Sequence, residues 1–386
     1  MPDKNSSRIR IGRPGLLTVT QSIGLAVALL TCTLVLTSAC HRAKVASAQE
    51  STQEEETPAD LSHPFMQADL SKFSLPAGIP ELDPPTADEI KVAELGRRLF
   101  FDPILSSDAS TSCATCHRPE NAFSSPLALA KGVQDRVGDR HPPTLVNRHL
   151  GTVQFWDGRV ATLEEQALEP IENENELASS IPKVLERLNE SDTYKKMFAD
   201  CFEDGISREN LASAIAGFER LLANGGSRID RFVTARESVL TKSERQGLWL
   251  YESKGGCWKC HSGQNYSDEM FHNTGVSVGK DLGRFDHTND ESHKGQFKTP
   301  TLRNVGMTAP YMHDGSIKTL REVVEFYNKG GENNPHLDEK MEPLELNESE
   351  VDDLVAFLKA LDGRYVWESA NSKPSGEQPA DDDESE

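Results

Sequence analysis

Two pentapeptides of this chain share one pattern: Cys113-Ala114-Thr115-Cys116-His117 and Cys257-Trp258-Lys259-Cys260-His261. In each, two cysteines flank a dipeptide and a histidine follows directly, which is the pattern that attaches c-type haem. The two thiols can reach both vinyl groups of one porphyrin, and the turn between them brings the next imidazole beneath the iron. The sequence therefore predicts two c-type haems. The predicted attachment residues are Cys113, Cys116, Cys257 and Cys260, and the predicted proximal iron ligands are His117 and His261.

A zinc site built from the same four cysteines is the alternative. Zinc ribbons usually place their cysteine pairs far closer together in the sequence. A site of four thiolates also gives no reason for a histidine directly after both pairs. We therefore favour haem over zinc.

The chain is strongly acidic. Its 386 residues include 62 Asp and Glu against 41 Lys and Arg, which gives a formal net charge of -21. This charge argues against nucleic acid as a partner, because DNA and RNA backbones are bound mainly through Lys and Arg. A small basic redox protein steered onto an acidic face suits the charge better, although acidic surfaces also serve solubility.

Residues 1–48 have the pattern of an export signal. A basic start precedes an apolar run over residues 23–36, and Cys40 follows shortly after it. Two cleavage points stay open: Cys40, with lipid attached to its thiol, or the small residues at 46–48. Export agrees with haem attachment, which takes place outside the bacterial cytoplasm. We therefore expect a periplasmic protein, anchored by lipid only if cleavage falls at Cys40.

Two further segments are acidic and poor in apolar residues. We expect residues 49–78 to form a disordered tether and residues 368–386 a disordered tail. Once the signal and the haem motifs are assigned, Cys201 is the only cysteine left. A disulfide scaffold is therefore excluded.

The rest of the chain shows a loose internal duplication. Thr86-x-x-Glu89 and Thr241-x-x-Glu244 are capping boxes that begin helices, and one haem motif follows each. Each half also closes with a helix, after Ser207 and after Asn347, whose apolar residues recur every three or four positions. This order is the plan of a small cytochrome c. We therefore predict a mainly α protein with two cytochrome c-like domains in tandem. The predicted domains cover residues 79–226 and 227–367.

Four more segments accompany the haem motifs. They are Phe155-Trp156-Asp157-Gly158-Arg159, Glu165-Gln166-Ala167-Leu168-Glu169-Pro170-Ile171, Thr299-Pro300-Thr301-Leu302-Arg303-Asn304-Val305 and Thr308-Ala309-Pro310-Tyr311-Met312-His313-Asp314-Gly315. With both motifs they make the chain resemble the bacterial di-haem cytochrome c peroxidase family over nearly the whole predicted folded part. The resemblance implies an enzyme that reduces hydrogen peroxide at the first haem and relays electrons through the second.

Two positions separate the branches of that family. Its peroxidases proper typically have a histidine that caps the first haem and a methionine as sixth ligand of the second. The resemblance puts Val133 at the first position and Tyr327 at the second, as in the MauG-type branch. It therefore implies an open first haem and Tyr327 ligation of the second, where phenolate favours high oxidation states of iron. The alternative ligands are Met307, Met312 and His272, and Tyr327 also fits an aromatic packed at a helix end.

The resemblance also assigns the residues around the first haem. Glu176 matches the distal acid, which moves a proton between the oxygens of peroxide, and Pro170 helps to keep that pocket tight. Trp156 matches a tryptophan between the haems that offers a site for charge transfer. The alternatives are an acid in a solvated loop for Glu176 and an aromatic core residue for Trp156.

The family often holds a calcium ion between the haems through one side-chain oxygen and two backbone carbonyls. Thr308 and Pro310 match the two carbonyl positions. His141 replaces the usual asparagine and offers no oxygen, although calcium prefers oxygen ligands. We therefore expect at most one calcium ion, at a site that His141 weakens.

Two hypotheses follow. The first is an exported di-haem peroxidase with MauG-like ligands, acting on hydrogen peroxide and re-reduced by a small redox protein or by a residue of a protein substrate. The second is a di-haem electron carrier without catalysis. A homodimer is left open.

Overall fold

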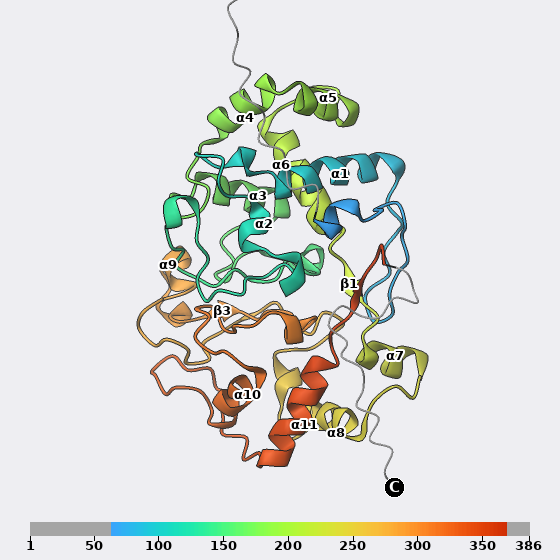
Figure 1. Ribbon diagram of the computed structural model, residues 1–386. Helices are drawn as coiled ribbons and strands as arrows, with labels where there is room; N and C mark the ends of the chain where they lie inside the picture. Colours follow the sequence, from blue (N-terminus) through green and yellow to red (C-terminus); the bar gives the residue numbers. More distant parts are fainter. Residues whose placement is uncertain (1–62, 369–386) are drawn as a thin grey trace, which may run out of the picture. The chain divides into compact units, whose positions relative to one another are not determined.

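The computed structural model describes residues 63–368 as two lobes, each with one haem motif (Figure 1). The predicted export signal, the first part of the tether and the tail from residue 369 lie outside the described residues. Among residues 63–368 no helix has both the length and the apolar character needed to cross a bilayer.

Helices dominate both lobes, which confirms the predicted mainly α fold with two tandem domains. The first lobe contains α1 (Ala87–Phe101), α2 (Cys113–Cys116), α3 (Leu163–Glu172), α4 (Ile181–Glu190), α5 (Asp192–Cys201) and α6 (Arg208–Arg220). The second contains α7 (Arg228–Ala235), α8 (Lys242–Glu252), α9 (Phe285–Thr288), α10 (Leu320–Asn328) and α11 (Glu348–Lys359). The strands are β1 (Asn224–Gly225), β2 (Phe271–His272), β3 (Phe297–Lys298) and β4 (Arg364–Tyr365). Short 3₁₀ turns occupy Pro64–Gln67, Pro103–Leu105, Pro119–Asn121, Val133–Asp135, Arg148–Leu150, Cys257–Lys259, Glu291–His293 and Val305–Met307.

The helices begin where the capping residues predict. At α1 the Thr86 hydroxyl accepts a hydrogen bond from the Glu89 amide, and the Glu89 carboxylate accepts one from the Thr86 amide. Thr241 and Glu244 form the same reciprocal pair at α8. Such a box satisfies amide groups that the first helical turn leaves without partners. The predicted starts of these two helices are confirmed.

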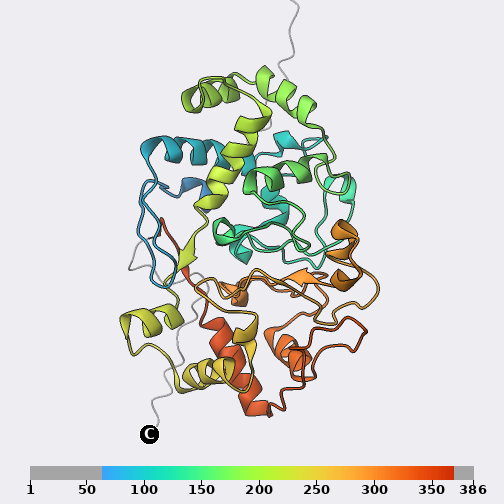
Figure 2. The same ribbon diagram turned by 180° about the vertical axis from the view of Figure 1, so that it is seen from behind.

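In each lobe the helix before the haem motif crosses the closing helix at a glycine. A Cβ on Gly96 of α1 would lie 1.8 Å from the carbonyl oxygen of Ala214 in α6. A Cβ on Gly247 of α8 would lie 2.0 Å from the carbonyl oxygen of Asp353 in α11. Both crossings are visible in Figures 1 and 2. Only glycine permits these close approaches, and their repetition supports the internal duplication.

The end of the described chain returns to the first lobe. Strand β4 pairs antiparallel with β1, with Asn224 opposite Tyr365, so that the segment after α11 lies beside the segment after α6 (Figure 1). Trp367 stacks on Tyr365 with ring centroids 5.0 Å apart, and both rings lie in the core of the first lobe. The last residues of the second predicted domain therefore stabilise the first.

Residues 63–78 differ from the expected disordered tether. Leu70 is buried in the core of the first lobe, and Phe65 packs edge-on against Phe123 with ring centroids 4.9 Å apart. The buried Arg97 of α1 donates hydrogen bonds to the carbonyl oxygens of Phe65 and Ala68 at 3.1 and 2.6 Å. A few apolar residues anchor this segment, although its average composition is polar.

A buried ion pair joins α7 to the segment before Val305–Met307. Arg303 Nη1 and Nη2 donate to the two carboxylate oxygens of Asp230 at 2.8 and 3.1 Å. Nη2 also donates to the carbonyl oxygen of Gly78 at 2.5 Å. Both charged side chains are almost completely buried, at 0% and 3% exposure. The pair therefore connects three distant segments of the chain.

Replacement of Asp230 by asparagine should lower the free energy of unfolding of the haem-loaded protein by about 3–5 kcal/mol, because it leaves the buried guanidinium without its counter-charge. Guanidinium chloride unfolding followed by far-UV circular dichroism measures the loss. Glu325→Gln is the control, because it removes an exposed ion pair with Arg321 and should leave the midpoint nearly unchanged. Equal losses in the two variants would contradict the role of the buried pair.

Candidate functional site

Two cavities lie over the two haem motifs. The first has a volume of about 900 Å³ and is lined by Cys113, Cys116 and His117. The second is lined by Cys257, Cys260 and His261. A cavity of this size suits a bound cofactor. Thus each predicted set of haem-attachment and proximal residues is gathered at one cavity wall.

Backbone carbonyls orient both proximal imidazoles. His117 Nδ1 lies 2.9 Å from the carbonyl oxygen of Phe123, and His261 Nδ1 lies 3.1 Å from that of Tyr266. Because a carbonyl only accepts, each Nδ1 carries the proton and each Nε2 keeps a free lone pair. Burial lowers the pKa of His117 to about 4 and also lowers that of His261. Both rings are therefore neutral and suited to bind iron, so the residues present fit a haem in each cavity.

The loops that supply these carbonyls are built in the same way. Phe123 and Tyr266 both have left-handed backbones, with φ of 55° and 49°, which bulky residues rarely adopt. A threonine hydroxyl donates to the carbonyl just before each aromatic residue. These bonds are Thr144 to Ala122 at 2.5 Å and Thr301 to Asn265 at 2.6 Å. The unusual backbone that aims the carbonyl is thus held by a second contact.

Both threonines belong to a repeat that the sequence analysis missed. Pro-Thr-Leu-x-Asn occurs at residues 143–147 and again at residues 300–304. The final Asn147 exchanges two hydrogen bonds with the backbone of Asn224 in β1, at 2.8 and 2.9 Å. The final Asn304 accepts one from the Gly363 amide, just before β4, at 2.7 Å. A search for short repeats within the chain would have found this element.

Glu176 and Pro170 both line the first cavity, as the resemblance implies. Asn173 donates a hydrogen bond to Glu176 Oε1 at 2.6 Å, and burial raises the pKa of the Glu176 carboxyl. The Val133 amide donates to the Glu176 carbonyl at 2.9 Å. A Cβ on the preceding Gly132 would lie 2.6 Å from Glu176 Cα, so glycine allows this loop to approach the acid. Position 133, where the family's capping histidine is expected, therefore contacts the backbone of Glu176, and its valine side chain carries no ligand atom.

Trp156 lines both cavities. Its indole Nε1 donates to the carbonyl oxygen of His141 at 2.8 Å, and its own carbonyl accepts from the Lys298 amide at 2.7 Å. The His313 ring, also shared by both cavities, lies edge-on to it with centroids 6.5 Å apart. The indole is thus fixed between the two haem cavities.

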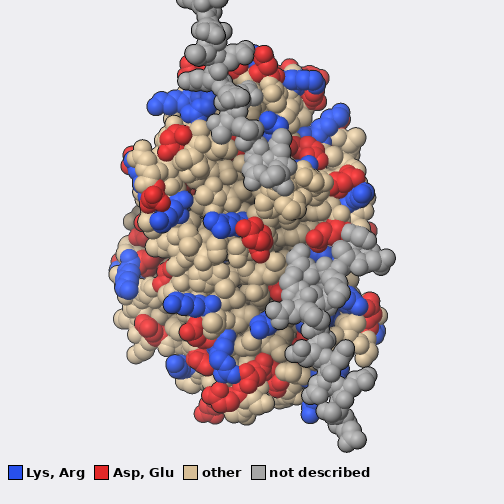
Figure 3. Space-filling view, viewed as in Figure 1, with Lys and Arg blue, Asp and Glu red and all other residues tan. Residues whose placement is uncertain are grey.

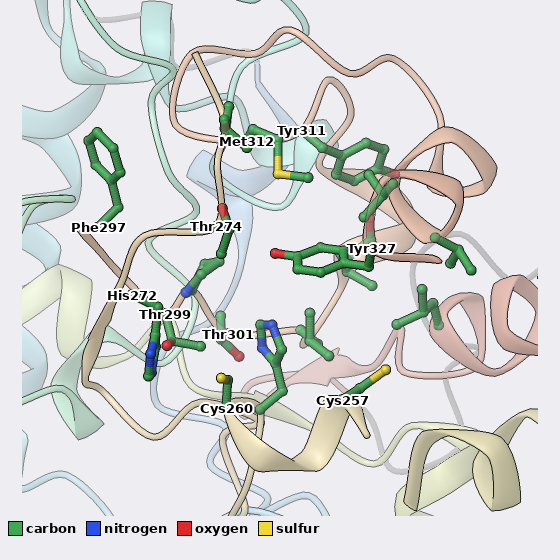
Figure 4. A pocket seen from close by; sticks show the side chains of 18 of the residues that line it. Cys257, Cys260, His272, Thr274, Phe297, Thr299, Thr301, Tyr311, Met312 and Tyr327 are labelled. Carbon is green, nitrogen blue, oxygen red and sulfur yellow. The ribbon is translucent and has the colours of Figure 1, made fainter. Parts of the chain in front are cut away.

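Tyr327, on α10, lines the second cavity. Figure 4 shows its ring across the cavity from Cys257 and Cys260, with the hydroxyl directed into the space between them. Burial raises the pKa of the phenol above its ordinary value, and the nearby Thr274 offsets this only in part. The side chain of Met312 also projects into this cavity (Figure 4). Tyr327 and Met312 therefore both present a potential ligand atom to the second cavity.

The other alternative ligands are engaged elsewhere. Met307 packs against the core of the first lobe. His272 lines the second cavity, but its two ring nitrogens lie 3.0 and 2.6 Å from carboxylate oxygens of Asp268 and Asp338. Neither residue offers a free ligand atom to the second haem cavity.

The residues of the expected calcium site lie close to the second cavity. Thr308, Pro310 and His141 all line it. His141 Nε2 lies 3.1 Å from the Ser124 hydroxyl, and its Nδ1 lies 3.1 Å from two backbone carbonyl oxygens. The imidazole is thus committed to hydrogen bonds, and the calcium site stays a prediction.

The surface does not mark a docking site by charge alone. On the face shown in Figure 3, basic and acidic side chains of the described residues are interspersed. The acidic excess of the whole chain is therefore not gathered into one patch on that face.

Comparison with known proteins gives a consistent result. Residues 91–238 match the family model for di-haem cytochrome c peroxidase, and residues 247–362 match that for cytochrome c. The methylamine utilization protein MauG of Methylorubrum extorquens is 39% identical over 307 residues, covering 78% of this chain and 87% of that protein. The cytochrome c551 peroxidase of Nitrosomonas europaea is 34% identical, covering 72% and 82%.

Among solved structures, a MauG-like protein associated with microbial copper homeostasis matches with a TM-score of 0.66 and 30% identity, covering 76% of this chain and 94% of that one. These matches confirm the resemblance and imply a c-type haem in each lobe. The chain belongs to the di-haem cytochrome c peroxidase and MauG family, oxidoreductases that act on hydrogen peroxide.

Proposed function

We propose that this protein is an exported di-haem enzyme with MauG-like ligands, which reduces hydrogen peroxide in the first cavity and recovers electrons through the second. The arrangement of three residues carries the proposal. Glu176 lines the first cavity, Tyr327 lines the second, and Trp156 lines both. When bound, the haems supply iron that binds peroxide in the first cavity and exchanges electrons in both.

Glu176 transfers protons in the reaction. Reduction of one peroxide to two waters consumes two electrons and two protons. To cleave the O–O bond heterolytically, a proton must move from the inner oxygen to the outer one, and a carboxylate held in the cavity can carry it. Asn173 holds one carboxylate oxygen by its hydrogen bond, so the other is left for peroxide.

Trp156 and Tyr327 take part in electron transfer. The indole is anchored at both its ring nitrogen and its backbone carbonyl, so it offers a fixed site for charge transfer between the cavities. If Tyr327 binds the second haem iron, it would do so as a phenolate, a hard anionic ligand that would lower the potential of that haem and let it share the oxidising equivalents. The valine side chain at position 133 has no ligand atom, so it would not compete with peroxide in the first cavity.

The electrons come from outside the protein. We propose a small redox protein or an oxidisable residue of a protein substrate as the donor, and the periplasm as the compartment in which the two meet. The export signal at residues 1–48 supports this location, because c-type haem is attached outside the cytoplasm.

Electron paramagnetic resonance of the resting ferric protein tests the proposal. We expect one high-spin signal from the open first haem and one low-spin signal from the second, together with peroxide-dependent oxidation of a reduced small cytochrome. Two low-spin signals and no turnover would instead identify an electron carrier.

Glu176→Gln should slow the reaction with peroxide by roughly 10²–10⁴-fold, because the amide cannot carry the proton. Stopped-flow spectroscopy of the haem bands measures the rate. Since burial raises the pKa of Glu176, the wild-type rate should fall with decreasing pH at a value above the ordinary 4.5 of a glutamate, as the carboxylate becomes protonated. This acid limb should disappear in the variant.

Glu174→Gln is the matched control, because Glu174 is an exposed acid in the same loop and does not line the cavity. It should react like the wild type. A wild-type rate in Glu176→Gln would remove the residue from the mechanism.

Tyr327→Phe should change the resting low-spin signal of the second haem and confine the peroxide-induced spectral change to the first. The phenyl ring keeps the packing but has no ligand atom. Tyr311→Phe is the control, since Tyr311 lines the same cavity but donates its hydroxyl to the Val305 carbonyl at 3.0 Å. An unchanged ferric spectrum in Tyr327→Phe would assign the sixth position to another residue, with Met312 the first to test.

A further inference from the structure

Lys298 is a buried cation that lines both haem cavities. It lies on β3, directly beside Trp156, whose carbonyl accepts a hydrogen bond from its amide. Its side chain is only 7% exposed. A buried ammonium normally requires a close anionic partner, because removal from water costs several kcal/mol.

The nearby carboxylate does not meet this need. Within residues 63–368, the carboxylate that pairs with Lys298 is that of Glu269, and Oε2 lies 3.7 Å from Nζ, beyond hydrogen-bond distance. Both oxygens of Glu269 already accept hydrogen bonds from the buried Arg148, at 2.8 and 3.1 Å. Arg148 and Lys298 therefore share one carboxylate, so the cluster has one positive charge in excess whenever Lys298 is protonated.

The pKa of Lys298 also shows that its ammonium lacks a close anionic partner. Burial, together with the neighbouring Arg148, lowers the pKa of Lys298 to about 7, and Glu269 offsets this only in part. A second carboxylate near Nζ would stabilise the charged form.

Two arginines that also line the first cavity, Arg140 and Arg159, have close carboxylate partners. Arg140 donates to Asp281 at 2.7 and 2.9 Å and to Asp157 at 2.6 Å. Arg159 donates to Glu169 at 2.7 Å. Lys298 differs from them because it is more deeply buried and has no carboxylate within hydrogen-bond distance among the described residues.

Every haem brings two propionate carboxylates into its cavity. We propose that the Lys298 ammonium binds a haem propionate and so completes the charge balance of the Lys298–Arg148–Glu269 cluster between the two cavities. Lys298 would then position the porphyrin and hold a positive charge near its iron. The inference deepens the proposed function and requires bound haem, but it does not depend on peroxide turnover.

Lys298→Met tests this in the haem-loaded protein without peroxide. Loss of the positive charge should lower the ferrous-to-ferric ratio of one haem at fixed applied potential, on the order of tenfold. It should also shift the propionate bending band in resonance Raman spectra. A potential change in the high-spin haem would assign the propionate to the first cavity, and a change in the low-spin haem to the second.

Two further variants separate binding from packing. Lys298→Arg keeps the charge and the donors and should restore both signals. Lys294→Met removes a cation from the same segment that lines neither cavity, and should change neither. Unchanged potentials and an unchanged Raman band in Lys298→Met, or equal changes in Lys294→Met, would overturn the proposal.

If Lys298→Met does not yield loaded protein, Lys298→Gln replaces it. Glutamine keeps a hydrogen-bond donor but carries no charge, so the ratio must still fall. Wild-type potentials of both haems in Lys298→Gln would equally overturn the proposal.

Discussion

In each lobe, a hydrogen bond between the histidine of the haem motif and a backbone carbonyl organises the surrounding loops. It fixes the tautomer of His117 and His261 and aims Nε2 into the cavity. To deliver these carbonyls, the chain holds two aromatic residues in a left-handed backbone and supports each with a threonine hydroxyl. The asparagine that ends each Pro-Thr-Leu-x-Asn repeat then connects the haem loop to the backbone beside β1 or β4.

The same repeat explains the position of Trp156. His141 and Lys298 each stand two residues before the proline of a repeat, so they are equivalent positions in the two lobes. The indole donates to the backbone at the first, and the tryptophan carbonyl accepts from the backbone at the second. Trp156, which belongs to the first lobe, is thereby held by hydrogen bonds to equivalent backbone positions in both lobes. These backbone hydrogen bonds therefore help to set the distance between the two cavities.

Local patterns in the sequence predicted the haem motifs, the capping boxes and the closing helices, because each depends on residues a few positions apart. The resemblance supplied Glu176, Pro170 and Trp156, which the structure gathers at the expected cavities. The packing of residues 63–78 and the pairing of β1 with β4 depend on contacts between distant segments, which composition does not reveal. The burial of Lys298 was missed for the same reason, since one lysine in a short polar stretch looks like any exposed one.

The return of Tyr365 and Trp367 to the first lobe limits how freely one half of the chain can be exchanged. Two independent cytochromes joined end to end could be cut apart at the linker and survive. Here a cut near residue 226 would remove Tyr365 and Trp367 from the core of the first lobe, and it would leave β1 and β4 without their pairing partners. A foreign cytochrome exchanged for the second half would therefore have to supply an equivalent strand and aromatic pair to the core of the first lobe.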